Sequence, residues 1–273
     1  MAKAFSLASW NVEHFKNSGS RVSHIVDFLI DPSGGNKPDV FALYEVEGKS
    51  VFSALVDRMA NYTFHITEGP QTQEILVGVR NTLTAFFTQK VEFKRGNERL
   101  RPGALLTLRV SGVDYSLLFL HTKSGPNPEG FGLRDSMSDR AVKFRHKLEK
   151  SAKLPKNTSN YMFLGDLNTM GMVYPYDQDI HPDLELRRLD SRAKRAQMTR
   201  LDKSNVTWWN GSQGNYAPSD LDHVVASNQI HFKNFAGHPV HVRGWVEKTT
   251  DAEKDAWIKK YSDHCLLYME VQK

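Results

Sequence analysis

The stretch Tyr161-Met162-Phe163-Leu164-Gly165-Asp166-Leu167-Asn168-Thr169 decides how the fold is interpreted. The apolar run at its start predicts a buried strand, and Gly165 leaves room for another group beside the backbone. Asp166 and Asn168 lie two residues apart, so in an extended chain both side chains point to the same side. A carboxylate and an amide at a strand end suit a bound water, metal ion or phosphate, but they also suit an Asx turn. This stretch alone favours neither interpretation.

Polar clusters of the same kind follow other apolar runs along the chain. They are Asn11; Glu45; His121; Asp166 with Asn168; Asp220, Asp222 and His223; and Asp263 with His264. Strand ends at one rim of a sheet are where sites are commonly built. Each cluster alone is typical of a turn residue or a packed histidine, whereas six of them together predict a functional site.

The residue types in these clusters narrow the chemistry. Carboxylate and amide oxygens are ligands of hard cations, which predicts Mg²⁺ or Mn²⁺, with Ca²⁺ as an accessory ion, rather than zinc. Asp222, Asp263 and His264 predict an imidazole paired with a carboxylate. A hard cation together with such a histidine is suited to the hydrolysis of phosphate esters.

Length and composition set the outer limits. The 273 residues, 40% of them hydrophobic, suit one large domain or two small ones, and we expect a single catalytic domain over residues 1–273. The net charge of +5 fits a polyanionic partner without establishing one. Cys265 is the one cysteine, which excludes an intrachain disulfide, and no apolar run predicts a signal peptide or a membrane span. We therefore expect a monomeric, cytoplasmic protein that does not bind membranes.

Periodicity predicts many strands and few helices. The expected strands are residues 4–12, 40–43, 62–66, 75–79, 84–93, 104–110, 115–121, 161–164, 221–226, 230–235 and 265–271. The expected helices are residues 22–29, 51–59, 139–150 and 251–261. Residues 126–132 are expected to form a loop, and residues 170–219 to be mostly irregular. This pattern indicates an α+β fold or a layered sandwich.

The order of the polar clusters resembles the endonuclease/exonuclease/phosphatase superfamily, and in particular its deoxyribonuclease I-like branch. The matching segments are residues 9–12, 38–45, 120–121, 165–168, 220–223 and 262–265. No single segment is specific, but the set in this order is, and it spans nearly the whole chain. The resemblance implies a four-layered α/β/β/α sandwich of two packed mixed β-sheets with helices outside.

The resemblance also implies a role for each matching residue. The implied metal ligands are Asn11, Glu45 and Asp263. The implied catalytic residues are Glu74, His121, Asp166, Asn168, Asp222 and His264. Among these, Asp166 would orient and deprotonate the attacking water, and His264, held by Asp222, would contact the phosphate.

Three further positions refine the resemblance. His121 stands near the place of a tyrosine in the abasic-site endonuclease branch, and residues 72–80 resemble a deoxyribonuclease stretch, so Glu74 and His121 would form a second acid/base pair. Glu74 is nearly as typical of an exposed charge at a strand start. The sequence departs from the family at Tyr44, usually Gln, and at Glu13, often Asn or Arg, where the carboxylate either adds charge to the site or faces water.

The substrate is suggested by a basic segment with aromatic residues after it. Its cations are Arg187, Arg188, Arg192, Lys194, Arg195, Arg200 and Lys203, and the aromatic residues are Trp208, Trp209, Tyr216 and Trp245. Such a pattern can follow a phosphate backbone and stack on bases, although a solvated Arg-rich helix beside core tryptophans would look the same. The predicted nucleic-acid-binding residues are Lys123, Arg140, Arg192 and Arg195.

Three functions remain open. The first is a metal-dependent DNA endonuclease that uses in-line attack of an activated water. The second is a phosphodiesterase or phosphatase acting on a DNA-end adduct, an inositol phosphate or a phospholipid head group. The third is a non-catalytic binding module, which ranks last because every expected catalytic side chain is present.

Overall fold

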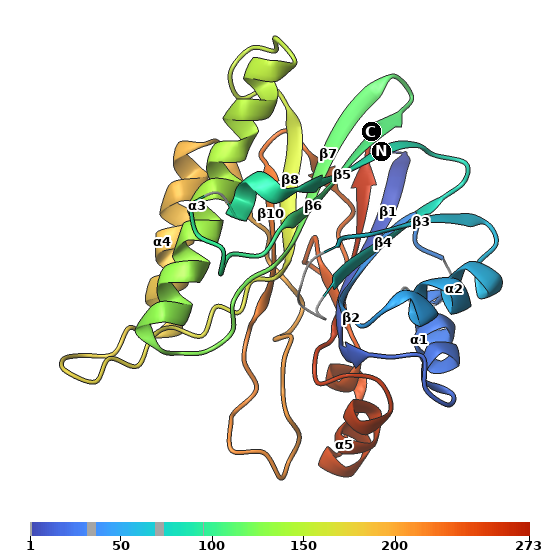
Figure 1. Ribbon diagram of the computed structural model, residues 1–273, viewed down its shortest axis with the longest axis vertical. Helices are drawn as coiled ribbons and strands as arrows, with labels where there is room; N and C mark the ends of the chain where they lie inside the picture. The colour runs from blue at the N-terminus through green and yellow to red at the C-terminus, as the bar shows by residue number, and fades with distance from the viewer. Residues whose placement is uncertain (1, 32–36, 69–73, 95) are drawn as a thin grey trace. The chain divides into compact units, whose positions relative to one another are not determined.

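The computed structural model describes residues 2–31, 37–68, 74–94 and 96–273, and the chain divides into two compact units. The first unit comprises residues 1–85, 202–219 and 231–273, and the second comprises residues 86–201 and 220–230. Each unit holds one β-sheet and its own helices (Figure 1). Because the chain alternates between the units, neither unit is one continuous segment, and the expected single catalytic domain stays a prediction.

The first unit is built on a mixed sheet. Its strands are β1 (Lys3–Phe15), β2 (Val40–Val46), β3 (Tyr62–Ile66), β4 (Glu74–Arg80), β11 (His231–Phe232), β12 (His241–Arg243) and β13 (Leu266–Gln272). They are ordered β11-β13-β1-β2-β4-β3, with β12 paired to β13. Strands β1 and β2 are parallel, and β13 runs antiparallel to β1. The helices of this unit are α1 (Arg21–Leu29), α2 (Lys49–Arg58) and α5 (Asp251–Lys260).

The second unit is built on a second mixed sheet. Its strands are β5 (Thr84–Lys90, which begins at the unit boundary), β6 (Gly103–Val110), β7 (Val113–His121), β8 (Asn160–Asp166), β9 (Met198–Arg200) and β10 (Asp222–Ser227). They are ordered β5-β6-β7-β8-β10-β9, with β7 and β8 parallel and β10 antiparallel to β8. Helices α3 (Pro128–Ser151) and α4 (Pro182–Arg195) lie side by side and share a hydrophobic core with the sheet (Figure 1).

The same strand arrangement in each sheet places polar residues together where the two central parallel strands end. In the first sheet the parallel strands β1 and β2 end together, and antiparallel β13 begins at that edge. In the second sheet β7 and β8 end together, and antiparallel β10 begins there. Residues at the ends of two strands and the start of a third, far apart in sequence, therefore become neighbours.

Two helices differ from the sequence-based expectations. Residues 126–132 were expected to form a loop, but α3 begins at Pro128, because the Asn127 side chain accepts a hydrogen bond from the Gly130 N–H and caps the helix. Residues 170–219, expected to be mostly irregular, contain α4. Only two apolar residues, Leu189 and Ala193, lie on its buried side, so the apolar pattern in the sequence is sparse. The expected strands 84–93 and 230–235 are shorter, ending at Lys90 and reduced to His231–Phe232.

Within the described ranges, no helix combines the length and the apolar character that crossing a bilayer requires.

Candidate active site

The first unit holds Glu45 at the end of β2. Parallel pairing sets Asn11 opposite Tyr44, and Asn11 Nδ2 donates to Glu45 Oε1 over 3.1 Å. Glu45 Oε2 accepts from the His14 N–H at 3.1 Å. Glu45 (φ 60°) and His14 (φ 47°) adopt left-handed backbone, which such residues keep only where the surroundings enforce it. The buried Tyr44, at which the resemblance would place Gln, has its hydroxyl 3.0 Å from Ser9 Oγ.

Asp263, the other predicted metal carboxylate, is held by two tryptophans. Trp208 Nε1 donates to Asp263 Oδ2 at 2.7 Å, and Trp245 Nε1 donates to the Asp263 carbonyl at 3.1 Å. The carbonyl of the next residue, His264, accepts from Trp10 Nε1 at 2.9 Å. Trp245 is buried, so it fits the core tryptophan that the sequence also allowed. The carboxylate of Asp263 thus has a fixed orientation just before β13.

Two residues without a predicted role join the end of β1 to the start of β13. Ser262 Oγ donates to the Asn11 carbonyl at 2.8 Å and accepts from the His264 N–H at 3.1 Å. Arg21, on α1, donates from Nη2 to three carbonyls, those of Val12, Glu13 and Tyr261. Both act on backbone atoms of distant segments, which no local sequence pattern reveals.

Negative charge is concentrated beside these predicted metal ligands. Partial desolvation raises the pKa of Glu13, and the charge of Asp263 raises it further. Arg21 opposes this effect, whereas Glu45 adds to it. The Glu13 side chain is exposed to solvent, and its contribution to the charge of a metal site stays a prediction. A bound cation would relieve the repulsion among these carboxylates.

The second unit brings four of the predicted catalytic residues together. The strand register sets both His121 and Asp222 opposite Asp166, and His121 Nε2 lies 3.6 Å from Asp166 Oδ2. Asp166 Oδ1 accepts from the Asn168 N–H at 3.0 Å, which is the Asx turn that the sequence allowed. The Asn168 side chain donates to the Thr122 carbonyl at 3.2 Å. Turn and polar cluster are therefore the same feature, with one Asp166 oxygen in the turn and the other near His121.

His223, from one of the predicted clusters, supports this arrangement from β10. Its Nε2 lies 2.7 Å from Thr169 Oγ1, and the Thr169 hydroxyl donates to the Asp220 carbonyl at 2.9 Å. These contacts join the residue after Asn168 to the start of β10.

Two predicted pairs draw one residue from each unit, and both stay predictions. They are His264 with Asp222, and Glu74 with His121. Glu74 begins β4, and its Oε2 accepts from Thr67 Oγ1 at 2.5 Å. Residues 72 and 73 of the deoxyribonuclease-like stretch lie outside the described residues.

The arginines of α4 and the strand after it are largely paired with aspartates of the same unit. Arg192 makes a two-pronged contact with Asp135, with nitrogen–oxygen distances of 2.7 and 3.0 Å, and Arg188 pairs with the same carboxylate. Arg200 pairs with Asp190 at 2.8 Å. Burial raises the pKa of Asp135, but hydrogen bonds from Arg192 and Arg188 outweigh it, so the pKa lies below its ordinary value. Part of the predicted basic segment is therefore neutralised.

The other predicted nucleic-acid-binding residues differ in how far their charged groups are exposed or already bonded within the protein. Lys123 is exposed on the loop after β7. Arg195 is exposed at the end of α4, and no described residue forms an ion pair with it. Arg140 Nη1 donates to the Phe93 carbonyl at 3.0 Å, so its guanidinium already contributes to the packing of α3.

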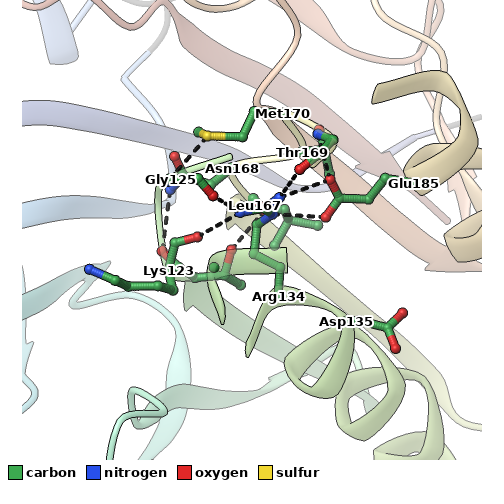
Figure 2. Close-up of polar contacts among 12 residues, drawn as sticks. Lys123, Gly125, Arg134, Asp135, Leu167, Asn168, Thr169, Met170 and Glu185 are labelled. Carbon is green, nitrogen blue, oxygen red and sulfur yellow. Dashed lines mark hydrogen bonds and ion pairs between the residues drawn. The ribbon is translucent and has the colours of Figure 1, made fainter. Parts of the chain in front are cut away.

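Arg134 and Glu185, which have no predicted role, form a buried ion pair beside the loops that follow β7 and β8 (Figure 2). They are 51 residues apart in the chain, and no motif marks either residue.

Comparison with known proteins connects these features. The model of the Endonuclease/Exonuclease/phosphatase family matches residues 8–264, a range that includes segments of both units. No curated protein shows significant sequence similarity to the chain.

Several solved structures share the fold at low sequence identity. TDP2 from D. rerio, in complex with a single-strand DNA product, has a TM-score of 0.62 and 15% identity, with 98% of this chain and 99% of that chain covered. The 3′ phosphatase NExo from Neisseria, bound to a product DNA hairpin, has a TM-score of 0.62 and 16% identity, with 99% and 100% covered. The mannosyl-6-phosphatase of Bacteroides thetaiotaomicron has a TM-score of 0.59 and 12% identity, with 98% and 100% covered. The predicted fold class, the α+β sandwich of this superfamily, is confirmed.

Proposed function

The chain belongs to the endonuclease/exonuclease/phosphatase family, and we propose that it is a metal-dependent phosphoesterase that hydrolyses phosphate esters of DNA. One observation carries this proposal. In each sheet, two neighbouring parallel strands carry residues of the family's polar clusters in their C-terminal parts, Asn11 and Glu45 in one and His121 and Asp166 in the other. Both groups fall inside the range that the family model matches.

The proposed metal is Mg²⁺ or Mn²⁺, with Ca²⁺ as an accessory ion. Glu45 and Asp263, together with the Asn11 amide, would hold it, because carboxylate and amide oxygens are the ligands that these hard cations prefer. Burial is the larger cause of the raised pKa of Glu13 and the charge of Asp263 the second, and that second contribution supports the fit because a cation would offset it. When bound, the cation supplies charge neutralisation at a phosphate oxygen.

The protein's own side chains would carry out the other steps of the hydrolysis. Asp166 orients a water molecule and takes a proton from it, and the water oxygen then attacks phosphorus in line with the bond that breaks. Its Asx turn supports this role, because the hydrogen bond from the Asn168 N–H fixes the carboxylate. His264, backed by Asp222, stabilises the negative charge that develops on the phosphate. His121 lies toward the leaving oxygen.

The reaction on an internal DNA phosphodiester, as in an endonuclease, is the first form of this proposal. Two structural relatives contain DNA, and the exposed Lys123 and Arg195 remain available for phosphate contacts. The ion pairs of Arg188, Arg192 and Arg200 favour a second form, a phosphoester at a DNA end. Asp135 and Asp190 offset two of these three positive charges, and arginines held in ion pairs add little to the binding of a long backbone, whereas a DNA end requires few phosphate contacts.

The first experiment compares substrates for the wild-type protein with Mg²⁺, with Mn²⁺ and with EDTA. The substrates are supercoiled plasmid, a labelled single strand, a labelled duplex, and oligonucleotides carrying a 3′-phosphate or a 5′-tyrosyl adduct. Metal-dependent nicking of plasmid supports the endonuclease form, and conversion of end-modified oligonucleotides alone supports the second form. Hydrolysis of inositol phosphates or phospholipid head groups without hydrolysis of any DNA substrate would contradict the proposal.

The matched variants are Asp166→Asn and Asp114→Asn. Both remove one carboxylate charge from the same sheet. Asp114 is exposed near the start of β7, whereas Asp166 lies beside the end of β7, at the last residue of β8. We expect Asp166→Asn to reduce turnover by about 10²- to 10⁴-fold, the usual contribution of a general base, and Asp114→Asn to leave it unchanged. Equal activity of the two variants would refute the assignment of Asp166.

A further inference from the structure

We propose that Arg134, together with Glu185, is a positioning residue that holds the two loops after β7 and β8 in one arrangement. These loops, residues 122–127 and 167–172, directly follow His121 and Asp166. The catalytic consequence rests on the proposed function, whereas the structural consequence for the loops can be measured without it.

The Arg134 guanidinium contacts both loops at once. Nη1 donates to the Gly125 carbonyl at 2.7 Å, in the first loop, and lies 3.4 Å from the Lys123 carbonyl. Nη2 donates to the Gly171 carbonyl at 2.5 Å, in the second loop. Figure 2 shows the guanidinium of this α3 residue between the loops and the Glu185 carboxylate. Arg134 is 1% exposed, so water does not replace these bonds.

Glu185, on α4, completes the arrangement. Its Oε1 accepts from Arg134 Nε at 2.8 Å, and its Oε2 accepts from the Gly171 N–H at 2.8 Å. Gly171 is thus bound at its carbonyl by Arg134 and at its N–H by Glu185. Burial raises the pKa of Glu185, and the hydrogen bonds from Arg134 and Gly171 oppose this shift. A buried pair of this kind is costly to break, because either partner alone would be an uncompensated buried charge.

The two loops are also bonded to each other, close to the catalytic side chains. The Thr122 N–H donates to the Asp166 carbonyl at 2.9 Å, and Thr122 Oγ1 donates to the Leu167 carbonyl at 2.7 Å. Farther along, the Val173 N–H donates to the Pro126 carbonyl at 2.6 Å. Displacement of either loop would therefore move the backbone that carries Asp166.

The local geometry explains why an arginine is suited to this place. Arginine has five N–H donors in a planar fork, enough to reach two loops and a carboxylate, whereas lysine has one ammonium group. Gly171 has φ 72°, and a Cβ there would lie 2.1 Å from the Ile180 carbonyl oxygen. The second loop therefore lies too close to the backbone of Ile180 for any side chain at position 171. The loop conformation depends on contacts that few substitutions can replace.

A second ion pair in the same unit provides a matched control. Arg145, also on α3 and 1% exposed, pairs with the buried Glu149. It donates to the backbone carbonyls of Ala196 and Gln197, which follow α4, and its Nη2 lies 3.4 Å from the Ser159 carbonyl, before β8 at the end opposite Asp166. Arg134→Met and Arg145→Met therefore remove the same chemistry from the same helix, and only the first removes bonds to the loops beside His121 and Asp166.

The kinetic experiment measures kcat and KM for bis(p-nitrophenyl) phosphate with Mn²⁺, per folded protein, in the wild type and in both methionine variants. We expect Arg134→Met to lower kcat by about 10- to 100-fold, the cost of displacing catalytic groups by about 1 Å, with little change in KM. Arg134→Lys is expected to recover little of this loss. Arg145→Met is expected to lower thermal stability to a similar degree and to keep kcat. An equal loss of kcat in both methionine variants would overturn the inference.

The structural experiment measures amide hydrogen exchange in the same proteins. We expect faster exchange at the N–H groups of Thr122, Gly171 and Val173 in Arg134→Met but not in Arg145→Met. Unchanged exchange at these amides would overturn the inference even if the protein hydrolysed no substrate, whereas a wild type without hydrolytic activity would refute the proposed function alone. Glu185→Gln, which leaves one carbonyl oxygen as an acceptor, serves the same comparison if Arg134→Met does not fold.

Discussion

The substitution Trp208→Phe tests whether Asp263 holds a metal ion. Trp208 Nε1 donates to the Asp263 carboxylate at 2.7 Å, and phenylalanine keeps an aromatic ring while removing that donor. The carboxylate would lose the hydrogen bond that orients it toward a bound cation, and we therefore expect weaker metal binding. Groups that hold a metal ligand in place typically contribute about 10- to 100-fold in affinity.

The expected magnitude follows from the geometry of this contact. A hydrogen bond to a charged group contributes about 1.5–3 kcal/mol, and each 1.4 kcal/mol corresponds to roughly a factor of ten in a binding constant. Trp208 is half-buried, so water can partly replace the indole N–H. We therefore expect the lower end of the range, an increase of about tenfold in the Kd for Mn²⁺.

The assay is a titration of Mn²⁺ followed by electron paramagnetic resonance of the free ion. The matched control is Trp245→Phe, because Trp245 Nε1 donates to the carbonyl of Asp263 and not to its carboxylate. We expect this variant to bind Mn²⁺ as the wild type does. Equal Kd values for wild type and Trp208→Phe, or equal weakening in both variants, would refute the reasoning.

Three further predictions concern stability. Burial raises the pKa of Asp39, but hydrogen bonds from the N–H and hydroxyl of Ser6, together with a lysine, outweigh it and lower the pKa below its ordinary value of 3.8. The ionised carboxyl therefore stabilises the fold above pH 3.8, and this contribution is lost as the pH falls through the lowered pKa. Urea unfolding should show Asp39→Asn less stable than the wild type at pH 7, with a difference that shrinks as the pH falls below 3.8. Gly78→Ala should lower the free energy of unfolding by about 1–3 kcal/mol or more, because a Cβ would lie 2.2 Å from the ring of the buried Phe41. Adding Phe41→Leu to this variant should restore part of the loss, and no recovery in urea unfolding would contradict this reason. Tyr161→Phe should lower the free energy of unfolding by about 1 kcal/mol, with an unchanged denaturant slope, since the buried hydroxyl donates to a carbonyl of α3; unchanged stability would count against that contribution.

Much of the fold follows from local pattern. Apolar runs with a period of two predicted most strands, and Val22, Ile25, Val26 and Leu29, spaced for one helix face, are the buried residues of α1. Helix α3 was missed at its start although Asn127 carries a capping signal, because a Gly- and Pro-rich segment was expected to form a loop. Helix α4 was not placed, although an Arg-rich helix was one interpretation of the basic segment, because only Leu189 and Ala193 mark its apolar side and its other positions are mostly charged.

The candidate site divides in the same way. Asp166, Asn168 and His121 were expected at strand ends, and the parallel register of β7 and β8 brings them together. Their supporting residues were not found from sequence. Arg134 reaches Glu185 and two loops through contacts that depend on how α3 and α4 pack.

The sequence by itself determined the kinds of residue at the strand ends and their order along the chain, because side-chain chemistry and the periods of strands and helices are local properties. The tertiary structure decided which charges are compensated and which side chains are held. Asp135 neutralises Arg192 across 57 residues, and Trp208 orients Asp263 across 55. Such pairs form only when folding brings distant segments within hydrogen-bond distance and removes water from between them. Neither condition can be predicted from a short stretch of sequence.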